Sequence, residues 1–485
     1  MKQVKHLILS LLMSVTFVGC GTGLKKVSEN EKPNILFIAI DDMNDWTGFL
    51  GGHPQTITPN MDKLAERGVS FINAHCSAPG CSPSRNALLY GVEPFKSGLY
   101  PFYGDEIHVQ LMDRYTTLPR LLNEDGYNTY TAGKIHHGLR GDSREWVDFL
   151  PKEEAKGKKE FKEGYGYQVG NDSKLSFRPT FNADEDHTDY KVASYGVDVI
   201  NKKHDKPFFL AVGIVKPHLP FDCPVRFFDA LPEHIEAPAI LEGDIKDIPV
   251  EGNSFRKVRD DRQFKKDKAW EDVRRAYLAC ISWADFNIGR VLDALEESPY
   301  ADNTIVVLWS DHGYHLGEKM SFRKFTLWEE ATKVPFIIYD GREKEQYKDR
   351  KYTKAVSLIN VYRTIADFAG LEVPEYVDGE SLVTVLNNTQ KELTKPTITS
   401  WGKGNFSVRT EDWRYIRYFD GTEELYNHKS DDNEWHNLAD KPEYKAKKEE
   451  LAKSLPQNEA PTIKEFVNIW SVQGEDKASL KGKSE

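Results

Sequence analysis

Four short apolar runs place the strongest constraint on how this chain can fold. They are almost continuously apolar and span 34–40, 208–214, 304–310 and 334–339. A run of this length and composition predicts a strand buried on both faces, so its sheet must be covered by helices on each side. Helical patterns lie between and after these runs, over 61–67, 117–124, 269–297 and 358–368. Strands that alternate with helices predict an α/β fold, with a large, mostly parallel mixed sheet sandwiched by helices.

The pattern changes from about Lys395 onwards. Three short strand-like stretches, separated by turn residues, are followed by one helical stretch; they lie at 406–409, 413–418, 424–426 and 444–454. This predicts a small C-terminal antiparallel sheet with a helix. A chain of 485 residues is long enough for a main domain over 33–394 and a smaller subdomain over 395–485.

Two stretches, 152–188 and 249–268, are dense in charge and poor in apolar residues. We interpret them as surface excursions. Long loops near an active face often shape a substrate cleft, although solvated decoration explains each stretch equally well.

The N-terminal sequence has the pattern of an export signal. Lysines precede an apolar run over 7–18, which is too short to span a membrane, and Gly19-Cys20 follows. A small residue directly before a cysteine resembles the lipobox of bacterial lipoproteins. That resemblance implies a signal peptide over 1–20, lipidation of Cys20 and a tether over 21–32. We therefore expect a membrane-anchored lipoprotein of the periplasm or cell surface, with an ordinary secretory signal as the alternative.

Net charge narrows the choice of partner. The chain has 65 Lys and Arg against 76 Asp and Glu, a formal charge of −11. This argues against nucleic acid or an acidic membrane surface as the main partner, so any contact with a membrane would be through the lipid anchor. An anionic substrate stays possible, because a pocket can be basic inside an acidic protein. Five cysteines are too few for a disulfide scaffold.

Acidic residues follow two of the predicted strands. Asp41 and Asp42 come after the first run, and Asp311 and His312 come after the third. Ligands collect outside the carboxyl ends of strands in open α/β sheets, so both pairs could face one site. Converging carboxylates repel one another unless a cation neutralises them, and oxygen ligands favour Ca²⁺ before Mg²⁺, although His312 is softer than Ca²⁺ usually prefers. Each pair taken alone could instead form an Asx turn or a helix N-cap.

Cys81 lies in the run Pro79-Gly80-Cys81-Ser82-Pro83-Ser84-Arg85. We predict a turn there, ahead of a helix-like stretch over 86–90. The N-terminus of a helix presents backbone N–H groups and positive dipole to an anion. The alternative for Cys81 is a disulfide with Cys76, which is plausible in an oxidising compartment.

The sequence Cys-x-Pro-Ser-Arg at Cys81 resembles the maturation signature of type I sulfatases. Further blocks resemble that family in its own order, at 32–42, 133–138, 216–221 and 310–318, with Lys324 after them. The Asp311-His312 pair is similar to the iduronate 2-sulfatase-like branch, and the likeness runs from about Lys32 to Leu438. The resemblance implies a bacterial polysaccharide-active member with an alkaline phosphatase/sulfatase-like fold and a catalytic domain over 33–394.

The resemblance also implies residue roles. Cys81 would be oxidised to formylglycine (3-oxoalanine) by a formylglycine-generating or anaerobic sulfatase-maturating enzyme, and Arg85 would support it. One Ca²⁺, with Mg²⁺ as the lesser candidate, would be held by Asp41, Asp42, modified Cys81, Asp311 and His312. Contacts to sulfate and to the leaving oxygen would come from Lys134, Lys324 and His218. His137 would act as the base, although His136 stands beside it where an aromatic residue is usual.

These roles predict a sulfuric ester hydrolase that removes O-sulfate, 2-O-sulfate in particular, from a sulfated polysaccharide or its oligosaccharides. The hydrated aldehyde would attack sulfur. Two alternatives stay open: a phosphatase or phosphodiesterase of the same superfamily, and a non-catalytic surface lipoprotein that binds glycans. Glycosaminoglycans and algal polymers such as ulvan or carrageenan are equally compatible with the sequence.

Overall fold

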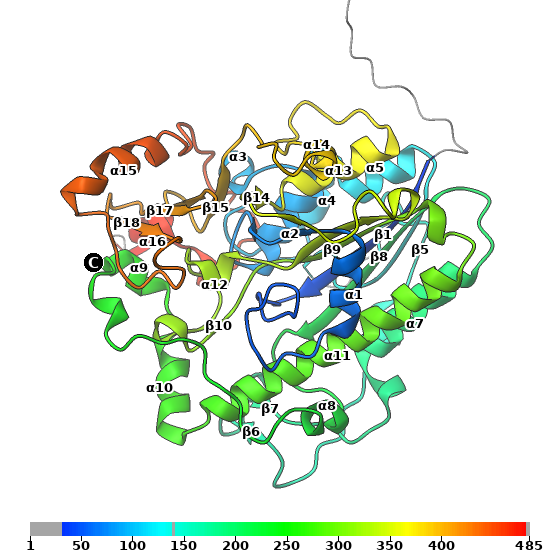
Figure 1. Cartoon of the computed structure of the whole chain (residues 1–485), viewed down its shortest axis with the longest axis horizontal. Helices are drawn as coiled ribbons and strands as arrows, with labels where there is room; N and C mark the ends of the chain where they lie inside the picture. Colours follow the sequence, from blue (N-terminus) through cyan, green and yellow to red (C-terminus); the bar gives the residue numbers. More distant parts are fainter. Residues whose placement is uncertain (1–31, 138–140, 482–485) are drawn as a thin grey trace, which may run out of the picture.

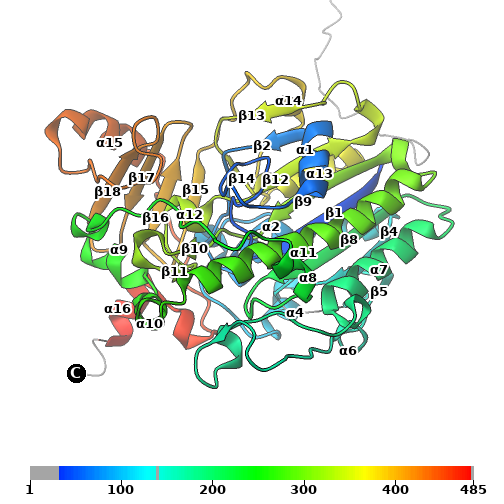
Figure 2. The ribbon, with the colours of Figure 1, turned by 60° about the horizontal axis from the view of Figure 1, so that its bottom comes forward.

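The computed structural model describes residues 32–137 and 141–481. Its largest sheet has eight strands: β1 (Asn34–Asp41), β2 (Val69–Phe71), β4 (Asn128–Gly133), β5 (Asp148–Phe149), β8 (Phe208–Pro217), β9 (Thr304–Ser310), β12 (Phe336–Asp340) and β13 (Arg350–Tyr352). Their order is β13-β2-β12-β9-β1-β8-β4-β5; Figure 1 labels β9, β1, β8 and β5 among them, and Figure 2 labels every strand of the sheet. Among these strands only β12 runs antiparallel to its neighbours, which confirms the predicted, mostly parallel sheet.

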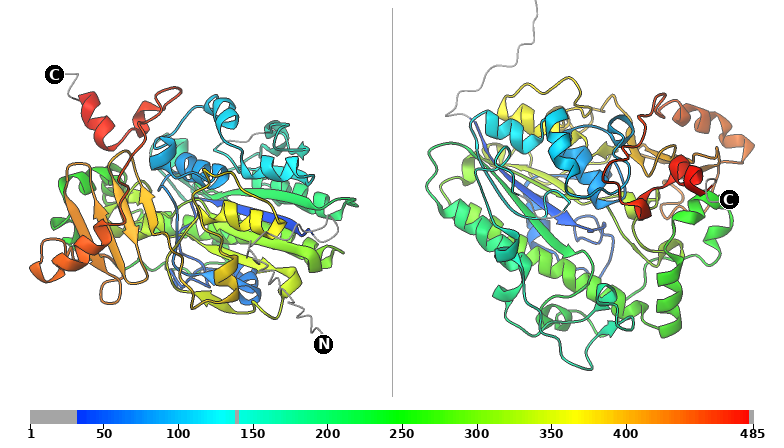
Figure 3. Two further views of the ribbon diagram at one scale, coloured as in Figure 1. Left: turned by 90° about the horizontal axis from the view of Figure 1, so that it is seen from above. Right: turned by 180° about the vertical axis from the view of Figure 1, so that it is seen from behind.

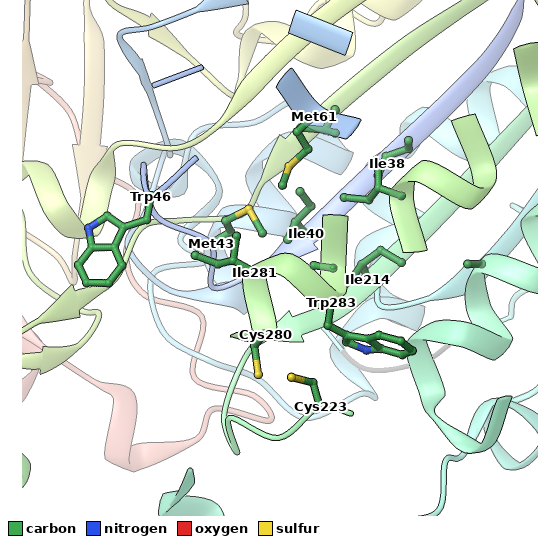
Figure 4. Close-up of a cluster of buried hydrophobic side chains, with 14 of the residues drawn as sticks. Ile38, Ile40, Met43, Trp46, Met61, Ile214, Cys223, Cys280, Ile281 and Trp283 are labelled. Carbon is green, nitrogen blue, oxygen red and sulfur yellow. The ribbon is translucent and has the colours of Figure 1, made fainter. Parts of the chain in front are cut away.

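The central strand β1 is buried on both faces, as its apolar run predicts. Side chains at 36, 38 and 40 pack in one hydrophobic core and those at 35, 37 and 39 in another. Figure 4 shows Ile38 and Ile40 beside Ile281 and Met61. The first core is covered by α1 (Pro59–Arg67), α7 (Thr188–Asn201) and α11 (Trp270–Glu297). The second is covered by α2 (Cys81–Tyr90), α5 (Leu118–Glu124) and α13 (Asn360–Ala369).

A second sheet lies at one end of the molecule (Figure 2). Four antiparallel strands form it in chain order: β15 (Thr397–Ser400), β16 (Phe406–Arg409), β17 (Trp413–Arg417) and β18 (Glu423–Asn427). The helix α15 (Lys445–Ala452) packs on it through Leu451. This confirms the small C-terminal antiparallel sheet. We did not predict β15, because Ile398 is its only strongly apolar residue.

Shorter elements make up the connections: β3 (Ala74–His75), α3 (Pro94–Ser97), α4 (Ile107–Arg114), α6 (Lys152–Ala155), β6 (Tyr167–Gln168), β7 (Ser176–Phe177), α8 (Val225–Asp229), α9 (Val250–Phe255), α10 (Val258–Asp267), β10 (His315–Leu316), β11 (Phe322–Arg323), α12 (Glu329–Thr332), β14 (Val356–Ser357), α14 (Val383–Asn387) and α16 (Gly474–Lys481). The stretch 249–268 is more ordered than we predicted, because α9 and α10 bury Phe255 and Phe264.

The predictions for the N-terminus concern residues that the structure does not describe. The signal peptide over 1–20, Cys20 and nearly all of the tether lie outside the described residues. Within residues 32–137 and 141–481, we find no helix with both the length and the apolar character needed to cross a bilayer.

A buried ion-pair network joins the two sheets. Arg414 on β17 is fully buried and pairs with Glu434, which follows β18, and with Glu329 at the start of α12. Its guanidinium also donates to the Leu327 carbonyl at 3.0 Å and to Thr332 Oγ1 at 3.0 Å. Because α12 comes shortly before β12 in the chain, Arg414 helps to hold the C-terminal sheet against the central one, together with Arg409, which pairs with Glu329 at 3.1 Å.

We predict that Arg414→Met lowers the free energy of unfolding by about 3–5 kcal/mol, because it leaves buried Glu434 without its main cation and Glu329 without one of its partners. Urea unfolding measures the change. Arg417→Met, on the same strand but partly exposed, is the matched control and should cost less than about 1 kcal/mol. Equal losses for the two variants would contradict the role assigned to the network.

Candidate active site

The structure brings the two acidic pairs together at one edge of the central sheet. Ile40 of β1 is in register with Ser310 of β9, so both pairs leave the sheet side by side. The backbone N–H of Asp42 donates to Asp311 Oδ1 at 3.0 Å, and His312 Nε2 lies 3.2 Å from Asp42 Oδ1. Asp42 itself has φ 64°, a left-handed conformation that aspartate tolerates better than most residues.

Cys81 lies at the centre of this cluster. Its Sγ atom is 2.9 Å from Lys324 Nζ, 3.3 Å from His312 Nε2 and 3.6 Å from Asp42 Oδ1. Cys81 is the first residue of α2, so the predicted turn over this segment is wrong and the helix begins five residues before 86. Pro83 does not prevent this, because the first turn of a helix does not need its N–H group.

The alternative partner of Cys81 lies in a different environment. Cys76 is buried with its Sγ 3.9 Å from the carbonyl of Ala331, and burial raises the pKa of its thiol. Both cysteines are free thiols in the structure. The geometry therefore favours the reading in which Cys81 belongs to the acidic cluster.

Arg85, one turn further along α2, binds two carboxylates of the cluster. Its guanidinium is fully buried; Nε donates to Asp311 Oδ2 at 2.8 Å and Nη2 to Asp41 Oδ1 at 3.4 Å. It also donates to the carbonyls of Lys134 and Ile135 after β4. One side chain thus orients two carboxylates and the end of a third strand.

Lys134 enters the site because Gly133 allows a close approach of the adjacent parallel strands β4 and β8. Gly133 has φ 77°, and a Cβ atom there would lie 2.0 Å from the carbonyl oxygen of Gly213. The N–H of Lys134 then donates to that oxygen at 3.0 Å, and its Nζ lies 2.6 Å from Asp41 Oδ2. A second ammonium group, from Lys324, pairs with Asp42.

The structure distinguishes the two adjacent histidines. His136 is buried, and its Nε2 lies 3.0 Å from Glu145 Oε2, so its ring is engaged away from the sulfur of Cys81. The His137 ring instead lies edge-on to Phe102 with centroids 5.2 Å apart. Burial, followed by the positive charge of Lys134, lowers the pKa of His137 to about 3. His137 is therefore neutral at pH 7.

His218 follows β8 and faces the cluster from another side. Its Nε2 lies 4.0 Å from Asp42 Oδ2, and about a third of its side chain, 35%, is exposed. Burial opposes protonation, but the charges of Asp42 and Asp41 outweigh it and raise the pKa of His218. Like His137, it is only partly buried.

Opposite charges balance within the site. Burial alone would raise the pKa of each carboxyl, yet neighbouring cations reverse this effect and hold the pKa of all three below the usual range; these carboxyls are Asp41, Asp42 and Asp311. The main cations are Lys134 for Asp41, Lys324 for Asp42 and Arg85 for Asp311. Burial also opposes ionisation of Cys81, but Lys134 and Lys324 lower the pKa of its thiol to about 7.

The donor set fits a hard divalent cation. Ligand atoms of Asp42, Cys81, Asp311 and His312 lie within 4.8 Å of one another, and a group that includes Asp41 overlaps it. Three buried carboxylates and one imidazole offer mostly oxygen ligands, as Ca²⁺ and Mg²⁺ prefer. The sulfur of Cys81 stands where formylglycine would place an oxygen atom.

Three residues that support this site were not predicted. Tyr277 donates its hydroxyl to the carbonyl of Asp42 at 2.7 Å, and Ser310 Oγ accepts from the N–H of Met43 at 3.0 Å. Phe102 packs on His137. Tyr277 lies in the third turn of a 28-residue helix and Phe102 in a connection, so no local pattern identifies either residue.

Comparison with known proteins gives consistent matches over most of the chain. A family model described as Sulfatase matches residues 33–371, and one described as N-sulphoglucosamine sulphohydrolase, C-terminal, matches residues 317–460. A sulfatase of Formosa agariphila is 36% identical over 472 residues, which cover 93% of this chain and 92% of that protein. Iduronate 2-sulfatase of Homo sapiens is 28% identical over 432 residues, 80% of this chain and 78% of its own.

Solved structures share the fold at lower identity. A complex with the substrate D-glucosamine-2-N,6-O-disulfate has a TM-score of 0.69 at 22% identity and covers 87% of this chain and 96% of its own. A phosphonate monoester hydrolase of Agrobacterium radiobacter has a TM-score of 0.67 at 19% identity, with 87% and 94% covered. These two structures indicate the fold and do not distinguish sulfate from phosphonate chemistry.

We predict that Ca²⁺ raises the thermal unfolding midpoint and that EDTA reverses the rise. Saturation at a hundred times Kd stabilises a protein by about 2.7 kcal/mol. Asp311→Asn removes one predicted ligand and should abolish the rise. Asp45→Asn is the matched control, because Asp45 pairs with Lys333 at 3.3 Å outside the donor set. A full Ca²⁺ response in Asp311→Asn would contradict the predicted metal site.

Proposed function

The chain belongs to the sulfatase family, and from that premise we propose that it removes O-sulfate, 2-O-sulfate in particular, from a sulfated polysaccharide or its oligosaccharides. It is a sulfuric ester hydrolase. Similarity to an iduronate 2-sulfatase supports a uronic acid or related sugar as the unit that carries the sulfate.

One observation carries the proposal: Cys81 Sγ lies where the metal-ligand cluster and two lysines meet. Lys324 Nζ is 2.9 Å from this sulfur, and Lys134 is paired with Asp41 beside it. When bound, a divalent ion held by Asp41, Asp42, Asp311 and His312 would polarise the sulfate, and formylglycine made from Cys81 would supply the attacking hydroxyl. A maturating enzyme that oxidises Cys81 is therefore a required partner.

The lysines bind the charge of the substrate. Both ammonium groups are largely buried, and each is paired with a carboxylate of the cluster, so they can contact the sulfate oxygens and the negatively charged oxygen of the leaving group. Positive charge that is already in place costs no reorganisation when charge develops in the transition state. Arg85 positions the carboxylates and does not need to reach the substrate.

The histidines move protons. Neutral His137 can accept one at a ring nitrogen, and we assign it the role of base. His218 Nε2, close to Asp42 and partly exposed, can hold a proton and give it to the leaving oxygen of the sugar. His136 is a structural residue in this scheme, because Glu145 engages its ring.

The activity itself is tested with two esters of one alcohol, 4-methylumbelliferyl sulfate and phosphate, after co-expression with a maturating enzyme. We expect the sulfate to be hydrolysed preferentially. Cys81→Ser should stop after about one sulfate transfer per molecule, because a serine ester cannot collapse to an aldehyde. Cys76→Ala, five residues earlier, should retain multiple turnovers. Preferential hydrolysis of the phosphate would instead favour the phosphatase alternative.

The assignment of the base gives a separate prediction. His137→Ala should lower kcat by about 10²–10⁴ with little change in unfolding free energy. His136→Phe should do the reverse, because it leaves buried Glu145 without its histidine and costs about 1–3 kcal/mol of stability. Steady-state kinetics and urea unfolding of both variants measure the two effects. A larger fall in kcat for His136→Phe would exchange the two roles.

We also propose export and anchoring through a lipid on Cys20, supported by the signal-like N-terminus alone. Cys20→Ala should move the protein from the membrane to the soluble fraction of cells; unchanged membrane recovery would contradict the anchor. The remaining alternative, a glycan-binding lipoprotein without catalysis, is favoured if mass spectrometry finds the Cys81 peptide as an unmodified thiol in a host with the maturating enzyme.

A further inference from the structure

Large apolar side chains are exposed beside the proposed active site. The segment 466–470 carries Phe466, Ile469 and Trp470, which are 43%, 73% and 63% exposed. Soluble proteins seldom expose several such side chains together unless the surface binds something. The segment is fixed in place: the N–H of Asn468 donates to the Phe102 carbonyl at 2.8 Å, and the N–H of Gly104 donates to the Phe466 carbonyl at 2.8 Å. Figure 3 shows this red end of the chain lying over the blue segments.

A chain of aromatic contacts connects Trp470 to the site. Its ring centroid lies 5.0 Å from that of Phe102 and 6.2 Å from that of Phe325. Phe102 in turn contacts His137, with centroids 5.2 Å apart, and Phe325 follows Lys324 directly. Phe102 and Phe325 are buried, at 4% and 8% exposure, so Trp470 provides the open face of the cluster. A ligand on that face would lie one aromatic ring away from the proposed base.

Positive charge borders the same aromatic cluster. Lys257 Nζ lies 5.0 Å from the centroid of the Phe325 ring. Burial, followed by the charges of Lys477 and Arg323, lowers the pKa of Lys257, so several cations gather here. Asp260 offsets them only in part, because it is paired with Arg323 at 2.6 Å. An anionic ligand would satisfy this excess of positive charge.

We propose that Trp470 and Lys257 form a subsite for the sugar unit next to the one that carries the cleaved sulfate, and that this neighbouring unit is anionic. The apolar face of a sugar ring would lie on the Trp470 indole, and its sulfate or carboxylate would face Lys257. The proposal rests on the proposed function, since it places a second unit of the same substrate. Continuity with His137 and the local positive charge favour this occupant over an apolar protein surface.

The test compares sulfate release from chain-length pairs, one and six sugar units long, prepared from heparin, chondroitin sulfate and carrageenan, because only the longer substrate has a neighbouring unit. We expect Trp470→Ala to raise KM for the cleaved hexasaccharide about five- to tenfold more than KM for the sulfated monosaccharide, a loss typical of a truncated aromatic anchor. Trp470→Phe should restore most of the difference. Ile469→Ala, an exposed neighbour outside the aromatic contacts, is the matched control and should behave as wild type.

The charge is tested on the same pair of substrates. Lys257→Gln should raise KM for the hexasaccharide about threefold and weaken its dependence on salt, whereas Lys257→Arg should not. Lys266→Gln, an exposed lysine on α10, controls for net charge.

Equal KM changes for both chain lengths in Trp470→Ala would overturn the subsite. The subsite would also be overturned if light scattering showed that the wild type is a dimer and that Trp470→Ala loses the dimer without a change in KM, because Trp470 would then bind a second copy of the chain. Failure of the wild type to hydrolyse 4-methylumbelliferyl sulfate or any oligosaccharide would instead be a failure of the proposed function.

Discussion

The architecture of this protein depends on bringing three carboxylates together in a place that water hardly reaches. Asp41, Asp42 and Asp311 are all within 1% of complete burial, so their mutual repulsion is hardly screened. Arg85, Lys134 and Lys324 offset it, each from a different part of the chain. These opposite charges are held in contact by three features: the strand register, the helix that begins at Cys81, and the close approach of β4 and β8 at Gly133.

The central sheet provides the rigid frame for this arrangement, and the C-terminal sheet extends it. The segment from Lys324 to Glu329 contributes to both, because its first residue contacts Cys81 and its last pairs with Arg414 on β17. The end of the chain then returns to the site, where Trp470 packs on Phe102. The chemistry that the family shares and the surface we assign to sugar recognition therefore lie close in space but on distant parts of the sequence.

How far the sequence predicts the structure depends on how local the signal is. The run at 34–40 is apolar on both faces, and β1 is buried as expected, whereas β15 has too few apolar residues to be noticed. The acidic pairs could be placed because strand ends share one edge of a sheet. The start of α2 was missed because Gly and Pro around Cys81 indicate a turn. His136 and His137 could not be told apart, since only packing against Glu145 and Phe102 separates them. Trp470 lies 368 positions after Phe102, and no local pattern predicts that contact.

The burial of Cys81 has a consequence for the timing of synthesis. Its side chain is 1% exposed in the folded chain, at the first residue of a helix packed between two sheet layers. An enzyme that modifies Cys81 would need the surrounding segment drawn out into its own active site. Under the proposed function, oxidation of Cys81 would have to precede folding. The fraction of active molecules would then depend on whether modification of Cys81 is faster than the collapse that buries it.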